Sequence, residues 1–199
     1  MRADLRESLA AIGKDFHARG WMAGTAGNLS AREPDGAIWI TASGRAKGRL
    51  TPTDFISLDG TGAPRPATPA LRPSAETALH LAVYRLFPDA RACLHIHSVA
   101  SCLSARAAIT DLRLPPLEML KAFDLWMDQP EVDLPVFPNH LDVGRIATEL
   151  EARFRQAPPA LSAFMIQNHG VTVWGTSPDE AYHRVEALEF LLEYLVRSR

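Results

Sequence analysis

Short apolar segments with strand periodicity alternate with longer segments of helical periodicity along the whole chain of 199 residues. Helices are predicted over residues 2–19, 75–88, 98–107, 115–126, 141–156 and 177–198. Strands are predicted over residues 37–41, 90–97, 131–137, 161–167 and 171–175, with a further strand and turn in 54–62. No linker or repeat interrupts the alternation, so we expect a single α/β domain over residues 1–199, with helices flanking one sheet. The turn Pro34-Asp35-Gly36 predicts a hairpin, so the sheet is at least partly antiparallel.

The charge and the hydrophobic pattern of the chain indicate which classes of binding partner are not expected. The formal net charge is −2, with no basic run or acidic tail, so neither nucleic acid nor an anionic membrane is expected as a partner. No apolar run reaches the length of a membrane span, and the N-terminal segment is too charged for the core of a signal peptide. The two cysteines, Cys93 and Cys102, form no CxxC pair. A cytoplasmic location is therefore expected.

Two histidines lie one residue apart in the segment "CLHIHS". Alternate residues of a strand face the same side, so His95 and His97 would project together. His169, in the turn "QNHGV", is the best candidate for a third ligand, and three imidazoles typically bind a catalytic divalent metal such as zinc. The alternative is that both strand histidines are ordinary half-buried residues. His80, one helical turn after Glu76, is expected to be structural or exposed.

Glycine-rich loops occur in the first half of the chain. "GTAGNLS" and "TASGR" combine glycine with short hydroxyl and amide side chains, a pattern that can present N–H groups to a phosphate. Ser74 is predicted to cap the helix that follows it and could add a hydroxyl. Each loop taken alone is better explained as an ordinary turn, and it is their number in one half of the chain that favours an anion site.

Two carboxylates are candidates for acid–base chemistry. Glu76 lies in the first turn of the helix after Ser74, where a favourable interaction with the helix dipole would already explain it. Glu118 lies among apolar neighbours in "PPLEMLKA", with Lys121 one turn later. Glu118 is either one half of a surface ion pair or a carboxylate that transfers protons beside a metal.

These motifs, in this order, resemble the class II aldolase/adducin-head superfamily over about residues 5–196. The motifs are "GTAGNLSAR", "ITASG", "PSAETALH", "HIHS" and "NHG". The resemblance implies a three-layer α/β/α fold with a mostly antiparallel central sheet, and a homotetramer with active sites at its subunit interfaces. It implies that the metal, commonly zinc, is held by His95, His97 and His169. It implies that the substrate phosphate is held by Asn28, Ser43, Gly44 and Ser74. Sugar-phosphate aldolases read "SSE" where this chain reads Ser74-Ala75-Glu76, so one hydroxyl near the phosphate is missing.

Several segments are similar to a dehydratase branch of the superfamily. They are "SGRAKGRLT", "PLEMLKA", "VFPNHLD" and "VWGTSPDEAYHRVEALEFL". The resemblance implies dehydration of a 2-ketose 1-phosphate, with Glu118 as the favoured general base and Glu76 as the second candidate. One alternative is a sugar-phosphate aldolase or 4-epimerase that uses Glu76. Another is a non-catalytic interaction domain of the adducin-head type.

Overall fold

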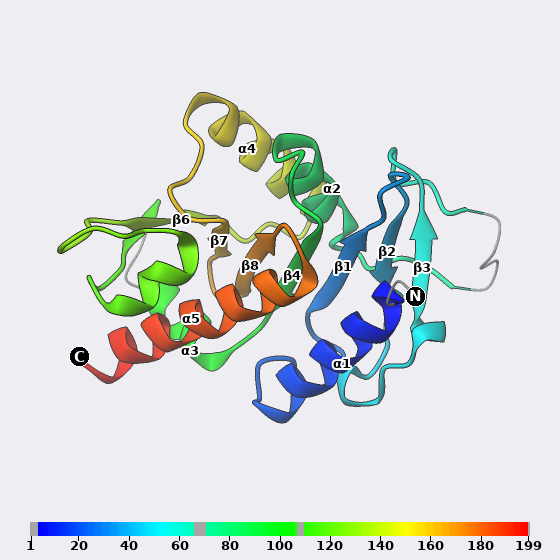
Figure 1. Cartoon of the computed structure of the whole chain (residues 1–199), viewed down its shortest axis with the longest axis horizontal. Coiled ribbons are helices and arrows are strands. Elements are labelled where there is room, and N and C mark those ends of the chain that lie inside the picture. The colour runs from blue at the N-terminus through cyan, green and yellow to red at the C-terminus, as the bar shows by residue number, and fades with distance from the viewer. Residues whose placement is uncertain (1–3, 66–70, 107–109, 199) are drawn as a thin grey trace.

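The computed structural model describes residues 4–65, 71–106 and 110–198. Eight strands form one sheet (Figure 1). The strands are β1 (Asn28–Arg32), β2 (Ile38–Thr41), β3 (Phe55–Leu58), β4 (Ala92–Ile96), β5 (Asp111–Arg113), β6 (Asp133–Phe137), β7 (Ala163–Ile166) and β8 (Gly170–Gly175). The helices are α1 (Leu5–Ala18), α2 (Thr77–Leu86), α3 (Val99–Ala105), α4 (Val143–Gln156) and α5 (Pro178–Arg197), with short 3-10 turns η1 (Lys47–Arg49), η2 (Pro52–Asp54) and η3 (Glu118–Phe123).

The order of the strands across the sheet is β3-β2-β1-β4-β8-β7-β6-β5. Only β6 and β7 pair in parallel among the described strands, and the other neighbouring pairs are antiparallel. The expected hairpin is confirmed, since β1 and β2 pair antiparallel around the turn at residues 33–37. The expectation of a mostly antiparallel sheet is therefore confirmed.

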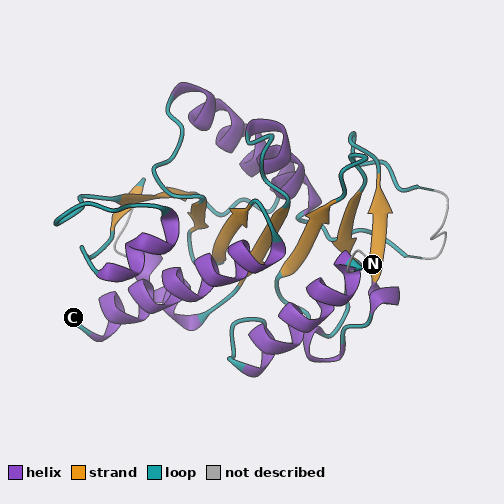
Figure 2. Cartoon of the chain, viewed as in Figure 1, coloured by secondary structure: helices purple, strands orange, loops and turns teal. Residues whose placement is uncertain are grey.

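Helices cover both faces of the sheet, which gives the three layers expected from the resemblance (Figure 2). Helices α1, α3 and α5 lie on one face, and α2 and α4 pack together on the other. Alternate residues of each central strand enter one core or the other. In β4, Leu94 and Ile96 join the core beneath α5, whereas Cys93 joins the core beneath α2. His95 shares the α2 face with Cys93 because the two residues are separated by one position.

The same alternation gathers polar residues in the middle of the α2 face. Leu29 of β1 packs in the core on the α5 side, so Asn28 and Ser30 face α2. Asn28 is the register partner of His95, which pairs on its other side with Thr172 of β8. A buried polar region therefore lies where three central strands meet α2.

Some sequence predictions need correction. Residues 115–126 were expected to be helical, but only η3 forms there, and Asp124 ends it in a left-handed conformation with φ 62°. Strand β5 was not predicted, because three residues are too few to show periodicity. The helix predicted over 98–107 is α3, although residue 107 lies outside the described residues. The cap predicted at Ser74 is wrong, since α2 begins at Thr77 and Glu76 occupies the cap position.

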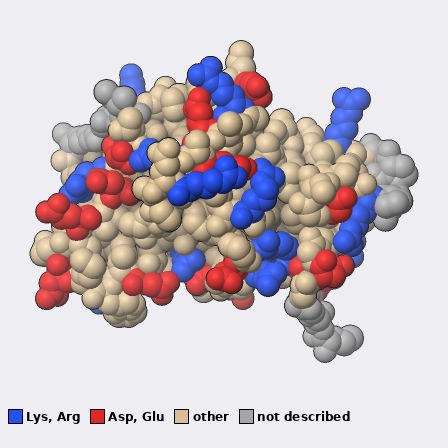
Figure 3. Space-filling view, turned by 90° about the horizontal axis from the view of Figure 1, so that it is seen from above, with Lys and Arg blue, Asp and Glu red and all other residues tan. Residues whose placement is uncertain are grey.

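Charged side chains of both signs are interspersed on the face seen from above (Figure 3). Arg85 of α2 pairs with Glu151 of α4 and so links the two helices, whereas Arg155 pairs with Glu151 within α4. Such exposed pairs each contribute at most about 1 kcal/mol. In the part of the chain that the structure describes, no helix is both long and apolar enough to cross a membrane.

Candidate metal centre and anion pocket

His95 and His97 lie side by side at the end of β4, as their spacing predicts. The strand ends at Ile96, and the backbone N–H of His97 continues the pattern by donating to the carbonyl of Trp21 at 2.9 Å. The two Nε2 atoms are 2.8 Å apart. His95 is fully buried, and its Nδ1 is 2.9 Å from the hydroxyl of Thr172, which holds its Nε2 toward His97.

The turn between β7 and β8 brings His169 to the same place. Asn168 adopts a left-handed conformation with φ 52°, which folds the turn tightly. Gly170 follows, and a Cβ there would overlap the carbonyl oxygen of Ile96, so only glycine lets β8 start this close to β4. The rings of His97 and His169 are 4.4 Å apart between centroids.

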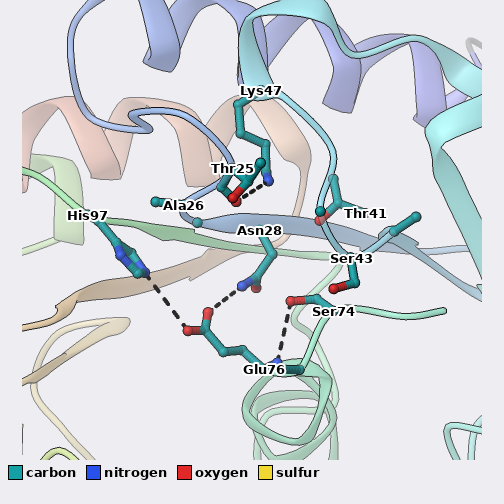
Figure 4. A pocket seen from close by; sticks show the side chains of 13 residues that line it. Thr25, Ala26, Asn28, Thr41, Ser43, Lys47, Ser74, Glu76 and His97 are labelled. Atoms are coloured by element: carbon teal, nitrogen blue, oxygen red, sulfur yellow. Dashed lines mark hydrogen bonds and ion pairs between the residues drawn. The ribbon is translucent and has the colours of Figure 1, made fainter.

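Glu76, at the N-terminal end of α2, completes the group from the helical layer that faces these strands (Figure 4). Its carboxylate oxygens lie 2.8 Å from Nε2 of His169 and 3.1 Å from Nε2 of His95. The distance to Nε2 of His97 is 3.9 Å. Burial alone would raise the pKa of this carboxyl, but the neighbouring imidazoles outweigh burial and hold the pKa well below its usual range. Glu76 is thus an ionised member of the cluster. It is not a solvent-exposed carboxylate whose only role is to interact with the helix dipole.

This group of residues fits a divalent metal. One ligand atom from each of Glu76, His95, His97 and His169 can be chosen so that all four lie within 4.8 Å of one another. Burial lowers the pKa of His97 to about 3 and also lowers that of His95, so both imidazoles are neutral, which is the form that binds metals. Three imidazoles and a carboxylate suit a borderline cation.

A cavity of about 250 Å³ opens beside the cluster. His97 and Glu76 form one wall, and the two glycine-rich loops form the others (Figure 4). The four residues expected to hold a phosphate all line this cavity: Asn28, Ser43, Gly44 and Ser74. The fold therefore brings together loops that the sequence alone left unconnected.

Lys47 also lines this cavity, and sequence reasoning missed it. Its side chain is only 2% exposed, and its Nζ donates to the carbonyls of Thr25 at 2.7 Å and Arg45 at 3.0 Å. Burial lowers the pKa of Lys47 to about 8. The segment "RAKGR" contains three cations, and nothing in it shows which one is buried.

Glu118 lies outside the histidine cluster and the cavity beside it. Its carboxylate is 80% exposed and accepts from Nζ of Lys121 at 2.7 Å, which makes the two residues a surface ion pair. Lys121 lowers the pKa of this carboxyl. Glu118 is not among the residues lining the cavity beside the histidines.

The amino-acid sequence matches a known protein family and several of its named members. Residues 7–196 match the family described as "Class II Aldolase and Adducin N-terminal domain". A methylthioribulose-1-phosphate dehydratase of Microcystis aeruginosa is 50% identical over 198 residues, which cover 98% of this chain and 97% of that protein. A protein of the same name from Leptospira biflexa is 40% identical, over 98% of this chain and 99% of its own length.

The fold of this chain also resembles that of solved structures. The l-fuculose-1-phosphate aldolase of Thermus thermophilus superposes with a TM-score of 0.79 at 27% sequence identity. The match covers 100% of this chain and 95% of that one. The arrangement of layers in this chain is thus shared with a solved sugar-phosphate aldolase.

Proposed function

Because this chain belongs to the family of class II aldolases and adducin N-terminal domains, we propose that it is a metal-dependent dehydratase. Its substrate would be 5-methylthioribulose 1-phosphate and its product 2,3-diketo-5-methylthiopentyl 1-phosphate, a step of methionine salvage. The observation that carries the proposal is the group of Glu76 and three histidines beside a cavity lined by anion-binding loops. The near full-length similarity to proteins named methylthioribulose-1-phosphate dehydratase supports the choice of substrate.

The phosphate would lie in the cavity between the glycine-rich loops. Asn28, Ser43 and Ser74 offer side-chain donors there, and Gly44 offers its backbone N–H. Lys47 adds a buried positive charge whose burial is unfavourable until an anion enters. Binding the phosphate, which takes no part in bond breaking, would fix the position of the reacting carbons.

His95, His97 and His169 would hold the metal, and we propose zinc. A divalent cation bound there supplies Lewis-acid stabilisation of the negative charge that develops on the substrate. The protein's own contribution is to keep the imidazoles neutral by burial and to fix their direction, as the hydroxyl of Thr172 does for His95. Glu76 keeps a negative charge within this group.

The reaction needs a group that removes the C3 proton and a group that helps the C4 hydroxyl leave. In the proposed sequence a carboxylate accepts the C3 proton, the C4–O bond breaks, and the hydroxyl departs as water with a proton from an acid. The resulting enol gains a proton at C4 and becomes the 2,3-diketone. We assign the base to Glu118 and keep Glu76 as the second candidate.

If Glu118 is the base, a second copy of the chain would have to bring it to the cavity. Its side chain is 80% exposed and does not line the cavity of its own chain. In a homotetramer with active sites at the subunit interfaces, Glu118 of one subunit would instead enter the cavity of its neighbour. Burial at that interface would also raise the proton affinity of the carboxylate.

The cytoplasm is the setting we propose for this activity. Both cysteines are free thiols, one buried and one half-buried, as suits a reducing compartment. The proposed partners are a small ketose phosphate and further copies of this chain, with no nucleic acid or membrane.

One observation favours a second candidate function. Glu76 lies in contact with the histidine cluster, where an aldolase or 4-epimerase on this scaffold would need its proton carrier. Such an enzyme would act on fuculose or ribulose phosphates, either cleaving the bond between C3 and C4 or inverting the configuration at C4.

Carbon NMR of the zinc-loaded protein with 5-methylthioribulose 1-phosphate distinguishes these functions. The proposed dehydratase gives the signals of a 2,3-diketone. An unchanged substrate, together with turnover of fuculose or ribulose phosphate, would assign the chain to the aldolase branch and the base to Glu76. No turnover of any of these compounds with zinc, iron or manganese would indicate a non-catalytic domain.

A further inference from the structure

A line of buried hydrogen bonds leads from Glu76 into the space between β1 and α2. Nδ2 of Asn28 donates to Oε2 of Glu76, and Oδ1 of Asn28 contacts Nε2 of His80. Nδ1 of His80 is 2.6 Å from Oγ of Ser30, which is 2.8 Å from the hydroxyl of Tyr84. All four residues beyond Glu76 are buried, at 4% exposure or less.

The spacing of these residues follows from the two elements that carry them. Glu76, His80 and Tyr84 are four residues apart, so they lie on one side of α2 and rise about 6 Å per step. Asn28 and Ser30 are two residues apart on β1, a step of about 6.7 Å on one face. The steps nearly match, so helix and strand side chains alternate along the line.

We propose that His80 is a positioning residue that fixes which end of the Asn28 amide faces Glu76. An ionised carboxylate can only accept hydrogen bonds, so Asn28 must turn its NH₂ group to Glu76 and its carbonyl oxygen to His80. His80 must then carry its hydrogen on Nε2. Its bare Nδ1 accepts from the hydroxyl of Ser30, and Ser30 accepts from that of Tyr84.

The opposite arrangement would place an oxygen against an oxygen. If His80 carried its hydrogen on Nδ1, its bare Nε2 would need a donor, and Asn28 would have to rotate its NH₂ group away from Glu76. The amide oxygen would then face the Glu76 carboxylate in a buried site, where unpaired polar groups cost most. Ser30 could then donate only to Tyr84 or to the carbonyl of Cys93, at 3.4 Å.

A doubly protonated His80 is also disfavoured. The ring is completely buried, and burial lowers the pKa of His80 to about 3. His80 is therefore neutral near pH 7 and holds one hydrogen, whose position sets the orientation of Asn28. The expected effect on catalysis rests on the proposed function, in which Glu76 is part of the active site. The tautomer of His80 depends on the fold alone.

Nitrogen-15 NMR of the histidine rings tests the tautomer without substrate. We expect the signals of His80, assigned by comparison with His80→Gln, to show a neutral ring protonated at Nε2 at pH 7. A ring protonated at Nδ1 would overturn the inference, whatever reaction the enzyme catalyses.

Two substitutions test the consequence for catalysis. His80→Gln can place an amide N–H near the position of Nε2, so kcat should stay within a few-fold of the unsubstituted protein. His80→Leu removes the donor, and kcat should fall about 10- to 100-fold, the usual effect of losing an outer-shell partner, with KM little changed. Tyr84→Phe should cause a smaller loss, because Asn28 and Ser30 still direct the ring of His80.

Circular dichroism and zinc content separate positioning from folding. Equal kcat for His80→Leu and the unsubstituted protein would overturn the role. Loss of kcat in His80→Gln as large as in His80→Leu, with both folded and zinc-loaded, would also overturn it. If His80→Leu does not fold, the tautomer and the His80→Gln result still decide.

Discussion

At the scale of single residues, burial determines the chemical state of each group in the site. His97 and His95 are neutral because they are desolvated, and Glu76 stays ionised because the neighbouring imidazoles outweigh its burial and hold its pKa low. The pair of strand histidines was predictable, since a spacing of two residues fixes a common face whatever the tertiary structure. Lys47 was not predictable, because its burial depends on how η1 packs against α1 rather than on its neighbours in sequence.

Lys47 should contribute most to binding the phosphate. Lys47→Met removes a buried charge facing the anion, and a charge-assisted hydrogen bond is worth about 1.5–3 kcal/mol, so KM should rise roughly 10- to 100-fold. Lys47→Arg keeps a charge and should lose less. Steady-state kinetics with the phosphorylated substrate, and inhibition by inorganic phosphate, give the comparison.

The pH dependence of kcat/KM provides a second check on Lys47. Burial lowers its pKa to about 8, so the free enzyme loses this positive charge as pH rises through that value, whereas the substrate phosphate stays a dianion. We expect kcat/KM to fall above pH 8 and the fall to disappear in Lys47→Arg, which remains charged. An identical alkaline fall in both proteins would show that another group is responsible.

At the scale of elements, the long periodic segments were the most predictable. Helix α5 begins with a cap at Ser177 and a proline at Pro178, and such cap and first-turn signals can be read from the local sequence. The prolines Pro115 and Pro116 predict a helix that starts after them, but only the short 3-10 segment η3 forms there, with Leu120 and Phe123 buried. The junction of β4 and β8 determines the cluster, because it places His97 and His169 together.

Gly170→Ala tests that junction. The added Cβ would overlap the Ile96 carbonyl and push the start of β8 away from β4. We expect a loss of about 1–3 kcal/mol in the free energy of unfolding, as in overpacked cores, together with weaker zinc binding. Urea denaturation and zinc titration measure the two effects.

Gly60→Ala is the matched control, because a Cβ at Gly60 meets nothing within 4 Å and its φ is not positive. It should leave both stability and zinc affinity nearly unchanged. Unaltered zinc affinity in Gly170→Ala would mean that the junction does not set the position of the histidines.

At the scale of the whole molecule, the order of the strands assembles the site. Strands β1, β4 and β8 are far apart in sequence but adjacent in the sheet, so Asn28, His95 and Thr172 lie in one row. Periodicity predicts the strands but says nothing of which strands become neighbours. The same limit applies between chains, since one sequence does not show which surface would carry Glu118 to a neighbouring cavity, as proposed.

Mixing two inactive variants tests whether Glu118 acts across an interface. Glu118→Gln lacks the proposed base, and His97→Ala lacks a proposed metal ligand of the neighbouring subunit. In randomly mixed oligomers, about a quarter of the sites combine intact Glu118 with intact His97, so activity should recover to about that fraction. Glu118→Gln mixed with unsubstituted protein is the control for subunit exchange.

Two outcomes would contradict the interfacial assignment. No recovery in mixed oligomers whose exchange is proven would place both residues in one subunit's site. Full activity of Glu118→Gln alone would remove Glu118 from the reaction and leave Glu76 as the base.

We propose that the histidine cluster holds one divalent metal on which turnover depends. The direct measurement is to strip the protein with a chelator, titrate zinc back, and record bound metal and dehydration together. We predict that turnover returns in proportion to bound zinc and saturates at one ion per chain, and that His97→Ala shows neither response. Full turnover by the stripped protein, or zinc bound equally well by His97→Ala, would show that turnover does not depend on a metal held by these histidines.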